Sequence, residues 1–229
     1  MAWCPLLDSI DVQITEHPPY SNSNLFRIRP VEHAVLKNIK FCFLYDSYTI
    51  LESLVVPGLK TLSLCDDTVI NIRSSSRIYS NPLGLLNRSH CDLRELQIVR
   101  CCFSQPELME YLEHRSCRTL TCLRVENDGH MLMTDEFLLR LTRVDGKAED
   151  SLCPELTHLA LTYYCSGNTS AGLLGRMVLS RSRKMERNRL ESFELLTDAS
   201  GFAETDKALL KCAEENGLKL CIKSGSIRW

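Results

Sequence analysis

The chain has 229 residues, which is enough to bury a sizeable core as one domain or as one continuous array. Its composition, 44% hydrophobic and 24% charged, argues against disorder over the whole length. The formal net charge of −2 gives no bulk attraction to nucleic acid or to an anionic membrane. No apolar run approaches the roughly 18 residues that span a bilayer, and Asp8 and Asp11 interrupt the start where a signal peptide would be apolar. We therefore expect a cytoplasmic or nuclear protein without a membrane partner.

Twelve cysteines occur in the chain. A small secreted domain would use them as disulfide staples, but we expect no export signal, and a chain of this length does not depend on them. Most lie within apolar stretches, as Cys42, Cys65 and Cys122 do, where a thiol behaves as a small hydrophobic side chain. The cysteines are therefore predicted to be reduced and structural.

One short apolar frame, L-x-x-L-x-L with other apolar residues allowed, recurs along the chain. Its seven matches are Leu7-Ile10-Val12, Leu36-Ile39-Phe41, Leu59-Leu62-Leu64, Leu93-Leu96-Ile98, Leu120-Leu123-Val125, Leu156-Leu159-Leu161 and Leu190-Phe193-Leu195. A degenerate last copy lies near Leu218-Leu220-Ile222, and successive copies start 23 to 36 residues apart. The alternating apolar residues at the fourth and sixth places point to one side of a short strand, into a core. The leading leucine enters the same core from the preceding turn.

Two copies open with the same motif. Residues 4–12 read CPLLDSIDV and residues 153–161 read CPELTHLAL, and both fit C-P-x-L-x-x-[LI]-x-[LV]. The proline stops the preceding helix or turn. We predict that Cys4 and Cys153 pack at that junction as structural residues and are not a reactive pair.

Segments between the later copies carry helix signals. Ser104-Gln105-Pro106-Glu107 is a capping-box pattern, and Thr134-Asp135-Glu136 opens a second helix. A third helix is predicted over about 171–186, and a fourth from about Thr205 to Asn216, where Gly217 ends it. The residues on one face of the third helix are Leu174, Met177, Val178, Arg181 and Met185.

Strand, turn, helix and turn, at roughly 30 residues a cycle, are the signature of a leucine-rich-repeat solenoid. We predict an α/β fold of about seven to eight irregular repeats, with a parallel β-sheet on the concave side and helices or loops on the convex side. Residues 1–229 would form one leucine-rich-repeat domain, irregular and loop-rich over 1–92 and more regular over 93–229. The segments 16–35 and 66–90 look richest in loops. The frames are predicted to lie in parallel strands, and not in antiparallel hairpins.

The turn position three places after each frame differs from that of a standard repeat, which has Asn or Cys there. Here the position holds Thr15, Leu44, Asp67, Cys101, Asp128, Tyr164 and Asp198. Only Cys101 fits, although an aspartate could substitute by accepting backbone N–H bonds. With its uneven P-x-L-x-x-L-x-L repeats, its C-P-x-L openers and the phrases LVVPGLKTLSL and CDLRELQIVRCC, the chain resembles the repeat region of F-box/leucine-rich-repeat proteins, the large fungal F-box-like set in particular.

This resemblance implies the substrate-recognition part of an F-box-type ubiquitin-ligase adaptor. An F-box, which opens with an L-P-x-E-type motif and continues as three short helices, is not visible, because Met1 falls directly into a repeat. A Skp1-like adaptor is therefore implied as a partner only if an F-box lies upstream. The alternative is a free-standing structural or scaffold repeat protein without a ligase role.

Motifs for catalysis and cofactors are missing from the sequence. It contains no G-x-S-x-G, no Walker-type glycine loop and no G-x-G-x-x-G after a strand, so we predict neither an enzyme nor a cofactor. A catalytic pairing made only in three dimensions stays open. The set closest to a zinc site, His114, Cys117 and Cys122, is interpreted as a helix-to-strand turn, because no C-x-x-C pair occurs.

The stretch from Arg176 to Arg189 could serve nucleic-acid binding. It holds six cations: Arg176, Arg181, Arg183, Lys184, Arg187 and Arg189. These could neutralise phosphates, but aromatic residues for base stacking are missing. We favour a solvated helix face over a nucleic-acid-binding solenoid.

Recognition of another protein remains. Side chains two, four and six places after each leading leucine would line the concave side of the sheet. The residues predicted to bind a protein there are Glu95, Gln97, Arg124, Glu126, His158, Thr162, Tyr164, Ser192 and Glu194. Arg124 is the strongest single candidate because Trp, Tyr and Arg dominate interface energetics. The sequence therefore predicts a non-catalytic protein–protein interaction module, whose target its composition does not name.

Overall fold

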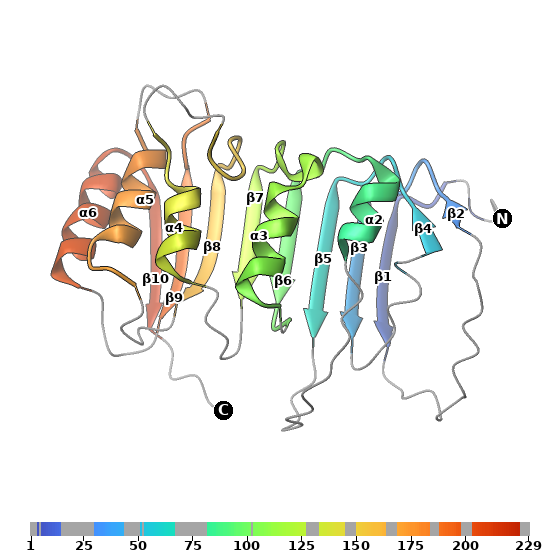
Figure 1. Ribbon diagram of the computed structural model, residues 1–229, viewed down its shortest axis with the longest axis horizontal. Coiled ribbons are helices and arrows are strands. Elements are labelled where there is room, and N and C mark those ends of the chain that lie inside the picture. Colours follow the sequence, from blue (N-terminus) through green and yellow to red (C-terminus); the bar gives the residue numbers. More distant parts are fainter. Residues whose placement is uncertain are drawn as a thin grey trace.

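The computed structural model describes residues 4, 6–14, 30–43, 51, 53–66, 82–101, 103–126, 133–144, 150–163, 169–183, 188–197 and 203–224. They form an α/β structure in which one large parallel sheet carries a row of helices on one face (Figure 1). The edge strands of this sheet are β1 at one end and β10 at the other. The α/β class and the parallel sheet agree with the sequence prediction.

The large sheet has eight strands, and their spatial order follows the chain. They are β1 (Ser9–Ile14), β3 (Asn38–Phe43), β5 (Thr61–Asp66), β6 (Glu95–Val99), β7 (Cys122–Glu126), β8 (His158–Tyr163), β9 (Ser192–Thr197) and β10 (Lys219–Ser224). Every neighbouring pair is parallel, which confirms the parallel arrangement expected of the frames. Two short strands, β2 (Val31–Glu32) and β4 (Leu54–Val55), pair separately.

The helices follow the strands along the chain. They are α2 (Pro82–Ser89), α3 (Gln105–Glu113), the 3-10 turn η1 (Arg115–Cys117), α4 (Asp135–Leu141), α5 (Leu173–Arg181) and α6 (Glu204–Glu215). The predicted capping box opens α3: Ser104 N–H donates to Glu107 Oε2 (2.7 Å), and Glu107 N–H donates to Ser104 Oγ (3.5 Å). Thr134 caps α4 in the same way, accepting from Phe137 N–H (3.3 Å). The segment 66–90 looked rich in loops, with room for a short helix at best, and α2 is such a helix of eight residues. Residues 67–81 of that segment lie outside the described residues.

The apolar frame builds the core between the sheet and the helices. The pairing register aligns the fourth residue of each frame with that of the next, so that Leu96 pairs with Leu123 and Leu123 with Leu159. The leading leucines of the second to seventh copies, Leu36, Leu59, Leu93, Leu120, Leu156 and Leu190, are at most 1% exposed. The last copy is a correction: Lys219 pairs with Ser192, which puts Gly217, and not Leu218, at the leading position. Gly217 has a φ of +97°, the left-handed conformation that ends α6. A glycine is favoured there, so the leading position of this copy has no leucine.

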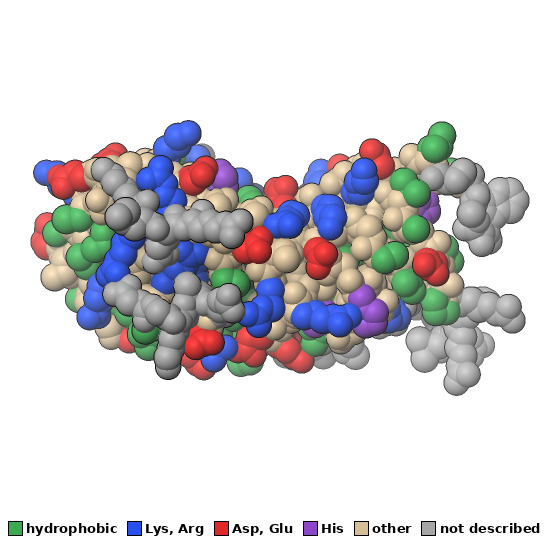
Figure 2. Space-filling model, turned by 90° about the horizontal axis from the view of Figure 1, so that it is seen from above, with side chains coloured by type: hydrophobic (Ala, Val, Ile, Leu, Met, Phe, Trp, Pro, Cys, Tyr) green, Lys and Arg blue, Asp and Glu red, His purple; other side chains and the backbone are tan. Residues whose placement is uncertain are grey.

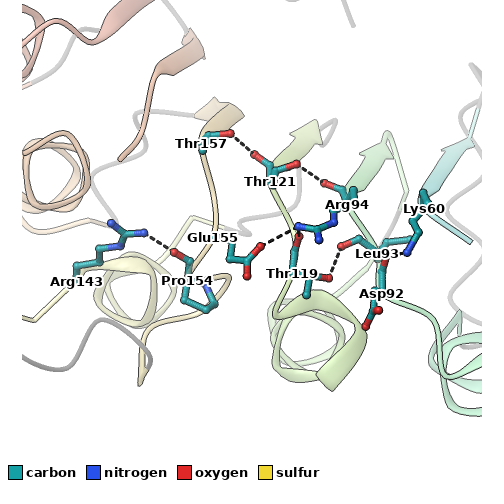
Figure 3. A network of polar contacts seen from close by, with 10 residues as sticks. All are labelled: Lys60, Asp92, Leu93, Arg94, Thr119, Thr121, Arg143, Pro154, Glu155 and Thr157. Atoms are coloured by element: carbon teal, nitrogen blue, oxygen red, sulfur yellow. Dashed lines mark hydrogen bonds and ion pairs between the residues drawn. The ribbon is translucent and has the colours of Figure 1, made fainter. Parts of the chain in front are cut away.

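A ladder of paired backbone hydrogen bonds holds the copies in register along the side of the sheet where the strands begin. The carbonyls that follow the first six leading leucines each accept two N–H groups from the next copy, and Glu191 O, which follows the seventh, accepts one from Lys219. Lys60 O accepts from Arg94 N–H (2.8 Å) and Glu95 N–H (3.0 Å), and Thr121 O accepts from Thr157 and His158 N–H (both 2.9 Å). Side chains reinforce this edge, since Thr121 Oγ1 donates to Arg94 O and Thr157 Oγ1 to Thr121 O (Figure 3). One backbone position in each copy therefore fixes the register of the next.

The C-P-x-L opener forms a tight turn into this ladder. Leu7 N–H donates to Cys4 O, and Leu156 N–H donates to Cys153 O, both at 3.1 Å. The same turn recurs without proline at Cys117, whose carbonyl accepts from Leu120 N–H (3.1 Å). Cys153 is buried as predicted, but Cys4 is exposed, so its predicted packing at the junction was wrong. Because β1 is the edge strand of the large sheet, no earlier copy in the described structure covers Cys4.

Helices α5 and α6 pack closely through a glycine and a buried carboxylate. Asp206 of α6 accepts from Gly172 N–H (2.9 Å) and Gly175 N–H (2.8 Å), which satisfies donors at the start of α5. A Cβ at Gly175 would lie 2.7 Å from Leu209 Cβ and 3.1 Å from Asp206 O. The two helices can approach this closely only because residue 175 has no side chain.

Gly175→Ala is expected to lower the free energy of unfolding by about 1–3 kcal/mol, because the two helices must move apart. Gly84→Ala is the matched control, since residue 84 is also helical and its nearest atom is Nη1 of the flexible Arg88, at 3.1 Å. The control should be neutral or stabilising by up to about 1 kcal/mol. Urea denaturation followed by far-UV circular dichroism measures both, and equal stability of the two variants would contradict this packing.

His114 bridges two consecutive copies in its neutral form. Its Nδ1 accepts from Ser116 N–H (3.2 Å), and its Nε2 pairs with Asn87 Oδ1 (3.0 Å), so the proton lies on Nε2. Burial, with the nearby charge of Arg115, holds the pKa of His114 below its ordinary value of 6.5. The unfolded chain therefore takes up this proton at a higher pH than the folded chain does.

Stability from His114 should be fully present above about pH 6.5 and should fall as the pH drops from there towards the lower folded pKa. His114→Asn removes the titrating group, so the variant should lose less stability than the wild type between pH 7 and pH 5. Urea midpoints measured across this range test the effect. Identical pH slopes for the two proteins would show that His114 contributes nothing to it.

Candidate protein-binding face

The helix-free face is the side of the large sheet opposite the helices. It is formed by the side chains two, four and six places after each leading leucine. The sheet register places them in three rows that run across the strands. The middle row reads Asp11, Lys40, Ser63, Gln97, Arg124, Ala160, Glu194 and Cys221. This continuous array matches the lining expected from the sequence.

Arg124 on β7 lies in the middle of the part of this face formed by β6 to β9. Its Nε donates to Glu126 Oε1 (2.7 Å), and its Nη2 pairs with the same oxygen. Its neighbour in the row is Ala160, a small side chain, and Glu194 comes next. Both Arg124 and Glu126 are partly exposed, so the ion pair faces solvent. The guanidinium is held by one carboxylate oxygen and presents its remaining donors on the surface.

Two further ion pairs flank this centre. Lys223 of β10 pairs with Glu194 of β9, and this hydrogen bond is the main cause that lowers the pKa of Glu194. At the opposite end, Lys40 Nζ lies 2.8 Å from Asp11 Oδ2. That hydrogen bond, with the charge of the carboxylate, raises the pKa of Lys40. The face therefore carries both charge signs, mostly matched in neighbouring positions.

The structure brings eight of the nine predicted binding residues together on four adjacent strands. Glu95, Gln97, Arg124, Glu126, Ser192 and Glu194 are partly exposed, and His158 is exposed. Gln97 Nε2 donates to Glu95 Oε1 (2.6 Å), which orients both side chains. Tyr164 lies outside the described residues.

Thr162 does not lie open on this face. It is 7% exposed, and its Oγ1 is buried without a hydrogen-bond partner in the described structure. Its register neighbour on β9 is the longer Leu196. A short side chain beside longer neighbours is covered by them, which the alternating sequence pattern does not reveal.

The basic stretch from Arg176 to Arg189 includes the most deeply buried charged side chain of the described structure. Arg181 is 0% exposed. Its Nε donates to Leu141 O (2.5 Å), its Nη1 to Cys153 O (3.1 Å), and its Nη2 to Leu152 O. The stretch is therefore not a uniformly solvated face, which corrects that part of our interpretation. The helical pattern that grouped Arg181 with Leu174, Met177 and Val178 on one face was right.

Arg143 is a second buried arginine, which no local sequence pattern indicated. It donates through Nη2 to Pro154 O (Figure 3). Its backbone N–H donates to Ser180 Oγ (3.1 Å). Both arginines thus bind carbonyls of the turn 152–154, which leads into β8. Their function in the structure is to donate hydrogen bonds to the carbonyls of this turn and, through Arg181, to Leu141 O at the end of α4.

Arg181→Lys should lower the free energy of unfolding by at least about 2 kcal/mol, because an ammonium cannot reach all three carbonyls that the guanidinium fork holds. Arg176→Lys is the control from the same basic stretch, since Arg176 is exposed and bonds Gly172 O in its own helix (3.2 Å). It should change stability by no more than about 0.5 kcal/mol. Thermal and urea unfolding of both variants decide the point, and equal losses would contradict the buried role.

The buried cysteines have the properties of core residues. Burial raises the pKa of Cys153 to about 12 and also raises the pKa of Cys91 and of Cys117. Such thiols are poor nucleophiles at neutral pH. Among the described residues, no group of three or more His, Cys, Asp or Glu side chains is arranged to hold a metal ion. No described helix has the length and apolar character needed to cross a bilayer.

A pocket of about 470 Å³ lies away from this face, where α3 and α4 end near the turn 150–154. Arg140 and Glu113 form an ion pair across it (2.5 Å), and Arg118 and Asp150 also line it. The only thiol in its lining, Cys153, has the raised pKa described above. The pocket therefore does not offer the activated nucleophile that covalent catalysis requires.

Comparisons of the chain with protein-family models, with curated proteins and with solved structures found no match.

Proposed function

We propose that this chain is an irregular leucine-rich-repeat solenoid that acts as a non-catalytic protein-binding module through its helix-free face. The observation that carries the proposal is the three continuous rows of side chains in one register across the large sheet. Seven gaps between strands, each about 4.8 Å, give a surface about 34 Å across. This width is sufficient for a protein interface of standard size.

The repeat interpretation is supported by the leading leucines and by the backbone ladder. Each of the second to sixth copies supplies one parallel strand, one buried leucine and one carbonyl that binds two N–H groups of its neighbour. A unit that contacts mainly its neighbours is the defining property of a solenoid. The uneven spacing of the copies would then be taken up in the segments outside the sheet.

Arg124 is the proposed anchor of the interface. It lies among carboxylates, with Glu126 bound to it and Glu194 two strands away in the same row. Arginine is enriched among interface hot spots because its planar fork makes several hydrogen bonds at once. A target that places a carboxylate or a carbonyl against the outer donors of Arg124 would use this group without breaking its bond to Glu126.

The cellular role that fits the family resemblance is that of the substrate-recognition part of an F-box-type ubiquitin-ligase adaptor. In that role the helix-free face would bind the target, and a Skp1-like protein would bind an F-box outside the repeats. The alternative is a scaffold repeat protein that binds a partner without delivering it to a ligase. Nucleic-acid binding through the stretch 176–189 is less favoured, because Arg181 is buried and already holds three carbonyls.

The binding proposal is tested with a matched pair of charge reversals. Arg124→Glu on the helix-free face should lower recovery of the chain's specific partners at least tenfold in quantitative affinity purification, which corresponds to about 1.4 kcal/mol. Arg140→Glu is the control, because Arg140 is also a partly exposed arginine in an ion pair with a glutamate, but away from this face. Equal recovery by wild type and Arg124→Glu, or equal loss in both variants, would contradict a binding site at Arg124.

The ligase role is tested separately by co-expression with a Skp1-like protein. The 229-residue chain and a version extended by the coding sequence upstream of Met1 are each purified and scored for that partner. Recovery with the extended version alone supports the adaptor role. Recovery with neither version removes it and leaves the scaffold alternative.

A further inference from the structure

Apolar side chains are exposed at the end of the large sheet formed by β1. Leu7 is 37% exposed, whereas the six leading leucines that follow it are at most 1% exposed. Leu6 is 90% exposed and Val35 45% exposed. The turn that carries Val35 lies against the same end, because His33 Nε2 pairs with Cys4 O (3.0 Å). Figure 2 shows hydrophobic side chains at this end of the molecule.

Among the described strands, β1 has no neighbour on its outer side. Its strand partner is β3, and no other strand of the described structure pairs with it. Ile10 and Val12 are only partly buried, although their counterparts Ile39 and Phe41 in the next copy are buried. An open strand edge with an apolar border is a template for a further strand.

The opposite end, at β10, has matching features. Ile222 is 43% exposed, and Leu220 is partly buried. The leading position of this copy is Gly217, and a Cβ built there would meet no atom within 4 Å. Where every other copy has a leucine, the last copy therefore has open space. The strand edge of β10 is unpaired on its outer side within the described residues.

We propose that copies of this chain associate head to tail, with β10 of one copy adding in parallel to β1 of the next, in the register used within the chain. In this register the exposed Leu7 lies beside the space at Gly217, and Ile10 and Val12 lie beside Leu220 and Ile222. The Leu218 carbonyl then faces the N–H groups of Asp8 and Ser9. The Glu191 carbonyl binds Lys219 N–H in the same way within the chain (2.9 Å).

Charge favours this arrangement over a contact between two β1 strands. The β10 end carries Lys219 and Lys223, and the β1 end carries Asp8 and Asp11, all exposed. Within the chain, Lys223 pairs with Glu194 and Asp11 with Lys40, so Lys219 and Asp8 contribute most to the difference between the two ends. A β1-to-β1 contact would bring carboxylates together, whereas the head-to-tail contact brings each carboxylate end to an ammonium end. Most of the exposed residues of α6 are polar, among them Lys207 and Lys211, so we place the contact in the strand layer.

A head-to-tail contact leaves a free β1 end and a free β10 end on every open assembly, so the association should continue as concentration rises. The proposal does not depend on the function of the helix-free face, which would remain open along the growing sheet. Its test is the mass of the purified 229-residue chain, measured by sedimentation and by light scattering across a wide concentration range. We expect the mean mass to increase steadily with concentration, and a monomer at every concentration would overturn the proposal.

Two variants that each block one end make the test specific. Leu7→Asp blocks the β1 end, and Ile222→Asp blocks the β10 end; both side chains are already partly exposed, so the fold should be kept, as circular dichroism verifies. Each variant alone should remain monomeric, whereas an equimolar mixture should form a dimer through the one intact junction. Leu139→Asp on α4 is the control, since Leu139 is exposed away from both ends, and it should associate like the wild type.

The mixture separates the possible contacts. If Ile222→Asp alone associates as strongly as the wild type, the contact joins two β1 ends and the head-to-tail proposal is wrong. A mixture that stays monomeric also overturns it. Should either blocking variant fail to fold, Lys219→Glu with Lys223→Glu replaces it: these exposed changes should weaken wild-type association at least tenfold, and unchanged association would contradict the proposed junction.

Discussion

The structure depends on one backbone constraint, the carbonyl after each leading leucine that accepts N–H groups from the next copy. These bonds lie at the edge of the sheet where the strands begin, and they connect Asp8, Lys37, Lys60, Arg94, Thr121, Thr157 and Glu191 to the copies that follow them. Because the carbonyl comes one residue after a leucine that is buried in the second to seventh copies, the core and the ladder fix the same register. A slip by one residue would turn the apolar frame towards solvent along an entire strand.

This constraint allows the segments between the strands to differ in length and sequence. On the helix side, these differences leave some backbone groups without regular partners. Segments of unequal length bring helix ends and turns together whose backbone groups have no regular partner. Arg181 satisfies carbonyls from α4 and from the turn 152–154, and Asp206 satisfies N–H groups at the start of α5. Each is a buried charge with several hydrogen bonds, which is the condition under which burial of a charge is tolerated. On the helix-free face the ion pairs Arg124–Glu126 and Lys223–Glu194 are partly exposed instead.

The sequence predicted those features that repeat and missed those that depend on a single distant partner. The period-2 alternation was sufficient to place every strand of the large sheet, the capping box placed α3, and the Thr134 N-cap placed the start of α4. Arg181 was grouped with cations because its partners Leu141 and Leu152 lie about 30 to 40 residues away, beyond any local pattern. The leading position of the last copy was placed near Leu218 and not at Gly217. Gly217 was recognised as the residue that ends α6, and a glycine does not match the apolar frame. On the candidate face, alternation identified the rows but not the burial of Thr162, which depends on the lengths of its neighbours.

The rule that stacks the copies also determines what happens at the two ends of the sheet. Each strand presents apolar side chains, unpaired backbone groups and a carbonyl to its neighbour. The frame contains no residue that would prevent a further strand from pairing with the first or the last one. Natural strand arrays stop by giving the terminal unit a polar outer face. The helix layer does so at α6, whose outer residues are charged, but the strand layer at β1 does not, since Leu7 keeps the frame residue and is exposed. At the β1 end, therefore, the apolar frame that packs against a neighbouring strand inside the chain is exposed. An apolar strand in the same register is the neighbour that this surface fits.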